Sequence, residues 1–216
     1  MKKYIFIVIV LMLPMLTNAQ GVWEIPNANA GDSPKKETKS AVPEKENPDA
    51  PYLAGAVPEV DGIVTWTLHV DAPSKSAQEL YDSMMGYFGQ LASQENQMEG
   101  SGISLVNKQE HTIIVSLREW MVFKASLLSL DRTKFFCKIM TTCKDGGVDV
   151  VIDRLTYRYE DNQPSGGLLV KAEEWISDKA ALNKKGKMYK GCAKFRRKTV
   201  DRMNELMNGI KLALLE

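Results

Sequence analysis

Apolar and polar residues alternate along several segments of this chain, which is the spacing of β-strands with one buried face. In the segment GIVTWTLHVDA, residues 62–72, the apolar positions share one face (Val64, Trp66, Leu68 and Val70). The same alternation predicts strands near residues 103–108, from about 111 to 123, at 133–144 and at 148–160. Because Asp145, Gly146 and Gly147 form a turn sequence, we expect the last three strands to make an antiparallel meander.

The strand at 148–160 changes its apolar parity part-way along. Its first half has apolar residues at even numbers and its second half at odd numbers (Val148, Val150 and Ile152, then Leu155, Tyr157 and Tyr159). A β-bulge adds one residue to one strand and shifts the alternation in this way. The pattern predicts a bulge near Asp153.

Two segments have apolar residues at helical spacing. The first, residues 75–92, begins with Ser76 followed by Glu79, a capping-box pattern. The second, residues 193–215, contains Gly209, and because glycine in a helix costs about 1 kcal/mol we expect close packing against the sheet there. Between the last strand and this helix, LLVKAEEWISDK predicts a strand end that runs into a short helix.

The predicted order is strand, helix, four strands, helix. Two amphipathic helices can cover one apolar face of an antiparallel sheet. We therefore expect an α+β fold with an antiparallel sheet of about five strands, two helices on one face, and the order β-α-β-β-β-β-α.

Residues 1–19 have the pattern of a cleavable signal peptide. Lys2 and Lys3 precede an apolar run that ends at Leu16, and Ala19 closes a small-residue cleavage site. The run is about 13 residues long, shorter than the about 20 that span a bilayer, and no cysteine follows it directly to carry a lipid anchor. We expect a mature protein that is soluble, periplasmic or secreted, and without a transmembrane segment.

Residues 20–61 are rich in Pro, Asn, Ala, Lys and Glu and poor in large apolar side chains, so they bury too little surface to offset chain entropy. They carry eight acidic and four basic residues. We predict a flexible arm, or one that orders on contact, with few anchors (Trp23, Ile25, Tyr52 and Leu53). Residues 62–216 then have the length of a single domain.

The overall charge argues against a nucleic-acid partner. The chain has 28 basic and 27 acidic residues, and loss of Lys2 and Lys3 with the signal peptide changes the net charge from +1 to about −1. Proteins that neutralise phosphates normally have a clear basic excess. The expected export argues against a nucleic-acid partner independently.

The three cysteines allow at most one disulfide. Cys137 and Cys143 lie in one predicted strand, roughly 20 Å apart, whereas bridged Cα atoms lie within about 7 Å. Cys192 bridged to either one, or three buried free thiols, are the alternatives that stay open.

No motif predicts an enzyme, a cofactor or a metal. GSGIS at 100–104 lacks the spacing of a nucleophile elbow, and no phosphate-binding loop follows a strand. Asp149 and Asp153 would be about 13 Å apart in a strand, outside the about 5–10 Å that paired glycosidase carboxylates need. His69 and His111 stand alone, and we expect both at the surface.

One basic run is the candidate for binding. From Lys179 to Val200 the chain contains no acidic residue, and the run ends in the first turns of the last predicted helix. Because helix N-termini favour anions, five residues would form an anion-binding patch (Lys190, Lys194, Arg196, Arg197 and Lys198). The partner would be an anionic envelope glycan or the acidic arm. A solvated basic loop is the competing interpretation.

Three segments resemble a known family. VVIDRLTYRY, AEEWISDK and GCAKFRRKTVDRMNELMNGI, in this element order, resemble the secreted Bacteroidetes domain of unknown function 4468, over about residues 62–215. The resemblance implies a TBP-like fold. It transfers no activity and no site residues, and the fold label by itself does not imply DNA binding.

The expected function is that of an exported, non-catalytic binding or scaffold module whose partner is an unknown envelope protein or an anionic glycan. The alternative is a domain that binds a small apolar ligand or a glycan between the sheet and the last helix. Aromatic residues would line that space or fill the core (Trp66, Trp120, Tyr157 and Trp175). An enclosed apolar void would favour the alternative, and a filled core would disfavour it.

Overall fold

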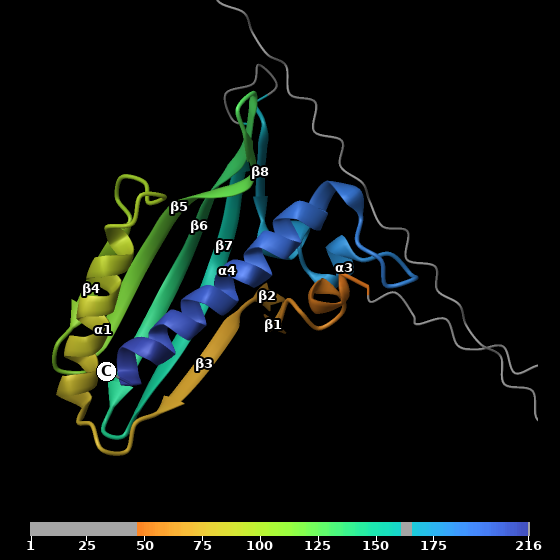
Figure 1. Ribbon diagram of the computed structural model, residues 1–216. Helices are drawn as coiled ribbons and strands as arrows, with labels where there is room; N and C mark the ends of the chain where they lie inside the picture. The colour runs from red at the N-terminus through yellow and green to blue at the C-terminus, as the bar shows by residue number, and fades with distance from the viewer. Residues whose placement is uncertain (1–46, 161–165, 216) are drawn as a thin grey trace, which may run out of the picture. The chain divides into compact units, whose positions relative to one another are not determined.

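The computed structural model describes residues 47–160 and 166–215. The predicted signal peptide and most of the predicted arm lie outside these residues. The centre of the fold is a six-stranded antiparallel sheet with the order β3-β7-β6-β5-β4, in which β8 also pairs with β7 (Figure 1). Its strands are β3 (Trp66–Asp71), β4 (Gly102–Asn107), β5 (Thr112–Ser126), β6 (Ser129–Lys144), β7 (Gly147–Tyr159) and β8 (Leu168–Lys171).

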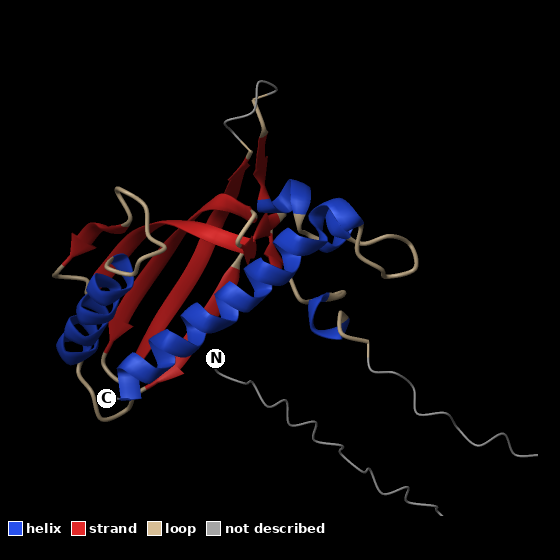
Figure 2. Cartoon of the chain, turned by 45° about the horizontal axis from the view of Figure 1, so that its top comes forward, coloured by secondary structure: helices blue, strands red, loops and turns tan. Residues whose placement is uncertain are grey.

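Two long helices, α1 (Ala77–Ala92) and α4 (Lys190–Leu215), lie on the same face of the sheet (Figures 1 and 2). The small elements are the 3-10 helix η1 (Ala50–Tyr52), the hairpin of β1 (Glu59–Val60) and β2 (Ile63–Val64), and the short helices α2 (Ala172–Trp175) and α3 (Asp178–Ala181). The predicted α+β class and the strand and helix order are confirmed. None of the described helices is long and apolar enough to cross a membrane.

The predicted bulge lies in the middle of β7. Phe136 pairs with Thr156 and Lys138 pairs with Asp153, so two residues of β7, Arg154 and Leu155, lie opposite one residue of β6. Arg154 takes up the extra length with a φ of 55°. The bulge also divides the outer edge of β7, because β3 pairs before it and β8 pairs after it.

The first helix begins as its sequence predicts. The Ser76 side chain accepts a hydrogen bond from the Glu79 N–H, and the Glu79 carboxylate accepts one from the Ser76 N–H. For Gly209 in α4, the sequence predicted close packing against the sheet. This prediction is wrong about the element that the glycine packs against. A Cβ at Gly209 would lie within contact distance of the Tyr87 side chain of α1, so the glycine lets α4 approach α1 and not the sheet.

Aromatic side chains fill the space between α4 and the end of the sheet near β8. Phe195 of α4 has edge-to-face contacts with Phe123 at 4.7 Å, Tyr157 at 5.3 Å and Trp175 at 5.9 Å between ring centroids. The Tyr157 hydroxyl lies 2.8 Å from that of Thr199, and both residues are fully buried. This part of the layer is a packed core, which disfavours a carried apolar ligand there.

Residues 47–61, which composition places in the arm, belong to the folded domain. The fully buried Arg196 donates hydrogen bonds to the carbonyls of Tyr52 at 2.6 Å and Leu53 at 2.7 Å. It also binds the Ile176 carbonyl and the Asp178 carboxylate. The predicted domain start at Gly62 is therefore too late, because the described residues from 47 onward belong to the domain. Tyr52 and Leu53 are anchors, as expected.

The cysteines are three buried free thiols. Cys137 and Cys143 both lie in β6, as predicted, and Cys192 lies in α4. Burial raises the pKa of the Cys143 thiol to about 11 and also raises the pKa of the other two. The alternative of a disulfide to Cys192 is excluded.

Candidate functional site

One face of the sheet is left uncovered by the helices of the described chain. Side chains of β5, β6 and β7 alternate between the helix-covered face and this open face, as strand geometry requires. Leu117, Cys137 and Tyr157 are buried beneath the helices. Their neighbours Arg118, Lys138 and Arg158 therefore point to the open face.

Four cationic side chains gather on this open face, and we call Arg118, Lys138, Arg154 and Arg158 the open-face cations. They line one hollow of about 610 Å³ together with the side chain of Phe136. Strand register brings them together, because Arg118 pairs with Phe136 across β5 and β6. The Arg158 guanidinium lies 5.9 Å from the centre of the Phe136 ring.

The open-face cations have no carboxylate partner among the described residues, since none of them has an ion pair within 4.0 Å. Lys138 donates a hydrogen bond to the Ser116 hydroxyl. Arg118, Arg154 and Arg158 are exposed. Four cations on a rigid sheet, none of them in an ion pair among the described residues, form an environment that favours an anion.

A second, more apolar hollow of about 490 Å³ adjoins the first and shares Lys138 and Arg154 with it. Its apolar wall comes from four strands (Leu105, Ile114, Met140 and Val151). Asp153 also lines it. The open face thus offers a cationic region beside an apolar one.

Arg154 lies between the two hollows in an uncommon backbone conformation. Its φ of 55° is in the left-handed region, which non-glycine residues seldom occupy and which often marks functional positions. Bulges redirect side chains next to binding sites. Without the bulge, regular alternation would turn residue 154 away from the open face. With the bulge, Arg154 points to the open face.

The structure does not gather the five residues of the predicted anion patch into one free site. Lys194 pairs with Asp131 at 2.8 Å, and Arg197 pairs with Asp49 at 2.8 Å. Arg196 is the buried anchor of the N-terminal segment. Successive residues on a helix point about 100° apart, so neighbours in this run face different surroundings. Asp49 belongs to the acidic segment that was one of the two expected partners.

Lys190 and Lys198, the remaining two, are both exposed. Lys198 lines a groove between β5 and α4 that also contains Glu119, Asp201 and Glu205. These acids make the groove a poor anion site. The cations that the fold gathers are those of the open face, which the basic run did not reveal.

A buried ion pair joins α4 to β5 within that groove. Glu119 is 1% exposed and accepts two hydrogen bonds from Arg202, each of 2.8 Å. Gln97 and Asn96 donate to the same carboxylate at 2.8 and 3.3 Å. The sequence signal was present, since Glu119 shares the parity of the buried Leu117 and Met121.

The histidines lie at the surface, as expected. His69 is bonded to Asp149 at 2.6 Å and to Asp71 at 3.2 Å, and these hydrogen bonds, the first above all, raise the pKa of His69 above its ordinary value of 6.5. The His111 imidazole lies 3.3 Å from the Gln78 amide oxygen. Within the described ranges no three His, Cys, Asp or Glu side chains are grouped to hold a metal.

Of the four aromatic residues that could line a ligand space or fill the core, three belong to the packed core. Trp66 and Tyr157 are buried in the core, and Trp175 packs on Phe195. Trp120 lies on the open face, with the Arg132 guanidinium stacked 3.7 Å above its ring.

Comparison with known proteins agrees with this architecture. Residues 66–158 match the family model described as a domain of unknown function (DUF4468) with TBP-like fold. The comparison with curated proteins finds no match. A TBP-like protein from Parabacteroides distasonis has 19% identity and a TM-score of 0.59 over 74% of this chain and 98% of its own, which shows the fold alone.

A crystal structure of a DUF4468 family protein from Bacteroides ovatus is similar in sequence as well as in fold. It shares 38% identity with this chain and superposes with a TM-score of 0.71, covering 78% of this chain and 96% of its own. The resemblance seen in the three sequence segments and the TBP-like fold that it implied are confirmed. The chain therefore belongs to the DUF4468 family.

Proposed function

We propose that this protein is an exported, non-catalytic binding module whose open sheet face holds an anionic partner, namely a phosphorylated or carboxylated envelope glycan. The observation that carries the proposal is the group of four open-face cations without a carboxylate partner among the described residues. Elsewhere in the described domain, Arg202 and Lys194 are each paired with an acid at 2.8 Å.

The chemistry of these side chains suits a ligand with planar or tetrahedral anionic groups. Arginine donates in a fixed fork that matches carboxylates and phosphates. Three of the four open-face cations are arginines, and they come from strands fixed in a continuous ladder. A rigid support of this kind keeps the ordering cost of binding low.

The neighbouring side chains fit a sugar. The Phe136 ring lies among the cations, and the apolar wall of the second hollow adjoins them. Sugar rings have one apolar face, so an aromatic beside anion-binding arginines accommodates a charged glycan. The predicted signal peptide directs the choice to an envelope ligand, and the packed aromatic cluster around Phe195 argues against the alternative site beneath α4.

The test is a polysaccharide binding titration with the mature chain. Dextran sulfate is the anionic probe and neutral dextran its control. Arg118→Gln/Arg158→Gln should weaken binding to dextran sulfate at least tenfold, since each charge-assisted hydrogen bond contributes about 1.5–3 kcal/mol. It should also reduce the dependence of affinity on salt concentration.

The matched control removes the same charge elsewhere. Lys184→Gln/Lys187→Gln changes two exposed residues of the loop before α4 and should leave affinity within about twofold. Equal losses in both double variants would mean that net charge, and not the open face, determines binding. Tight binding of neutral dextran would also contradict the proposal.

A further inference from the structure

The hairpin that joins β5 to β6 ends in two leucines that no other described residue covers. Leu127 and Leu128 are 105% and 99% exposed. Because Ser126 pairs with Ser129, the two leucines are the central residues of a two-residue turn. Such turns normally contain Asn, Asp or Gly. Neither the geometry of the turn nor packing against the rest of the described domain accounts for leucine at these two positions.

The same end of the hairpin carries further exposed apolar surface. Leu130 is 55% exposed and Val122 is 38% exposed. β6 pairs with β7 only from Thr133 onward, so this end is a narrow two-stranded ribbon. Figure 1 shows it rising beyond the layer formed by α1 and α4. We call Val122, Leu127, Leu128 and Leu130 the tip cluster.

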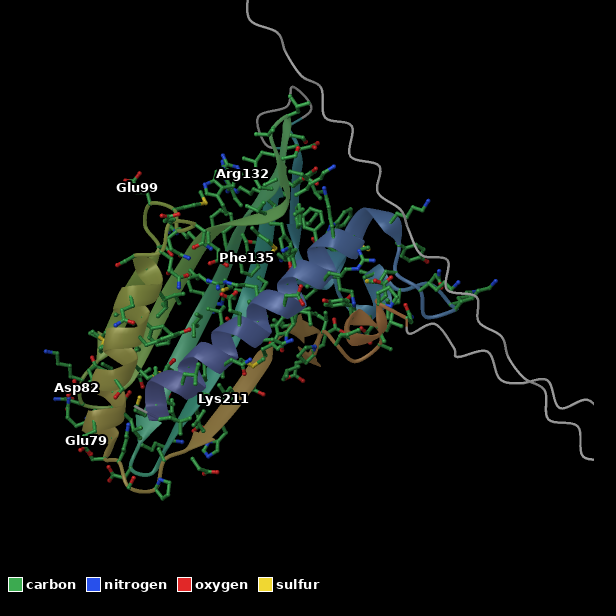
Figure 3. The ribbon with its side chains drawn as sticks, viewed as in Figure 1. Glu79, Asp82, Glu99, Arg132, Phe135 and Lys211 are labelled. Atoms are coloured by element: carbon green, nitrogen blue, oxygen red, sulfur yellow. The ribbon has the colours of Figure 1, made fainter. Side chains whose placement is uncertain are left out.

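The charges around the tip cluster are basic. From Lys124 to Lys134 inclusive the sequence has three cations and a single acid, Asp131. Asp131 is engaged by Lys194 at 2.8 Å and by the Tyr159 hydroxyl at 2.9 Å. Lys124 is exposed on the ribbon, and Arg132 lies toward the same end of the sheet (Figure 3). An apolar tip flanked by cations is complementary to an apolar layer flanked by anions.

We propose that this tip inserts its leucines into an anionic lipid bilayer surface, with Lys124 and Arg132 at the level of the headgroups. Shape favours a bilayer over a protein partner. A stable protein interface buries about 800 Å² per partner and packs its anchors in pockets, whereas a turn on a narrow ribbon presents a small convex knob. A bilayer interface accepts a convex apolar group and attracts basic residues beside it.

The experiment is vesicle co-sedimentation of the mature chain. The vesicles are phosphatidylcholine with phosphatidylglycerol at roughly three to one, and pure phosphatidylcholine for comparison. We expect binding to the anionic vesicles and at least about tenfold weaker binding to the neutral ones. Leu127→Ser/Leu128→Ser should weaken partitioning into anionic vesicles by roughly a hundredfold.

Two controls separate insertion from other effects. Leu212→Ser/Leu215→Ser removes two leucines of α4 that are 63% and 78% exposed, and it should bind like the unchanged chain. A tryptophan introduced by Leu128→Trp should be quenched by brominated lipids within the bilayer. Both tip variants change exposed side chains, so their unfolding midpoints should match that of the unchanged chain.

Three results would overturn the inference. The first is equal vesicle binding by the Leu127→Ser/Leu128→Ser variant, since charge alone would then explain it. The second is no binding of the unchanged chain to anionic vesicles. The third is self-association without lipid that the same variant abolishes, which would assign the leucines to a second copy of the chain. The tip variants should retain dextran sulfate binding, so this test is independent of the one for the open face.

Discussion

Replacing Arg202 by methionine tests how the buried ion pair holds α4 on the sheet. The change leaves the Glu119 carboxylate, 1% exposed, with only the amide donors of Gln97 and Asn96. Breaking a buried pair in this way typically costs about 3–5 kcal/mol because a charge remains buried without its counter-charge. The converse change, Glu119→Gln, should cost less, since Arg202 keeps a second partner in Glu205 at 2.8 Å.

The magnitudes give a ranked expectation. We expect Arg202→Met to lower the free energy of unfolding by about 4 kcal/mol, or roughly 8–16 °C in the unfolding midpoint of a domain of this size. Glu119→Gln should lower it by about 1–3 kcal/mol. The double change Glu119→Leu/Arg202→Met removes both charges and should recover at least about 2 kcal/mol relative to Arg202→Met.

Urea unfolding followed by tryptophan fluorescence measures these differences, with unchanged m-values as the check that the denatured state is the same. Glu205→Gln is the control, because Glu205 is an exposed partner, with 69% of its side chain accessible, and should contribute less than about 0.5 kcal/mol. A loss below about 1 kcal/mol for Arg202→Met would refute the reasoning. So would a double variant as unstable as the sum of its single changes.

Three further predictions follow from single contacts. Gly209→Ala should lower the free energy of unfolding by about 1–3 kcal/mol, because the alanine Cβ would overlap the Tyr87 ring and hydroxyl. This loss is expected even though alanine favours helix over glycine. Adding Tyr87→Phe should restore most of the lost stability in the same urea assay. Hydrogen bonds to Asp149 and then Asp71 raise the pKa of His69 above 6.5, so its stabilising contribution is present below about pH 6.5 and is lost as the pH rises through the higher folded-state value. The unfolding midpoint should therefore fall more steeply from about pH 6 to 9 in the unchanged chain than in His69→Gln. Burial and a raised pKa, about 11 for Cys143, should keep all three thiols from a thiol reagent at about pH 8 until the protein unfolds; rapid reaction of the native protein would contradict the buried placement.

Alternation along the strands predicted most of the fold, because burial on one face leaves a period of two in the sequence. It located the bulge in β7 from the change of parity between Ile152 and Leu155. The capping pair Ser76 and Glu79 likewise fixed the start of α1. These features are local, so a single stretch of sequence contains the whole signal.

Composition placed the start of the domain too late, at Gly62. An argument from composition considers only apolar surface, and residues 47–61 have little apolar surface. They are held instead by hydrogen bonds from the buried Arg196 to backbone carbonyls of Tyr52 and Leu53. Backbone carbonyls are the same in every sequence, so composition could not identify them as partners.

The candidate site was missed for a related reason. The basic run near Lys194 and Arg197 is conspicuous in the sequence, but the helix turns these residues toward separate acids. The open-face cations are distributed between residues 118 and 158, on three strands. Only the register of the ladder, which single-strand patterns do not contain, brings Arg118, Lys138 and Arg158 into one hollow.

The two faces of β5 separate charges that stabilise the fold from charges available to a ligand. Glu119 and Arg118 are adjacent in β5, but Glu119 points to the helix-covered face and Arg118 to the open face. The inward charge would be costly alone, and Arg202 accompanies it. The outward charge is solvated and needs no partner to be stable, so the lack of an ion pair at Arg118 and the other three open-face cations carries no folding cost. Selection for stability alone gives no reason to concentrate such cations on one hollow of the sheet, and the anionic ligand proposed above would give one.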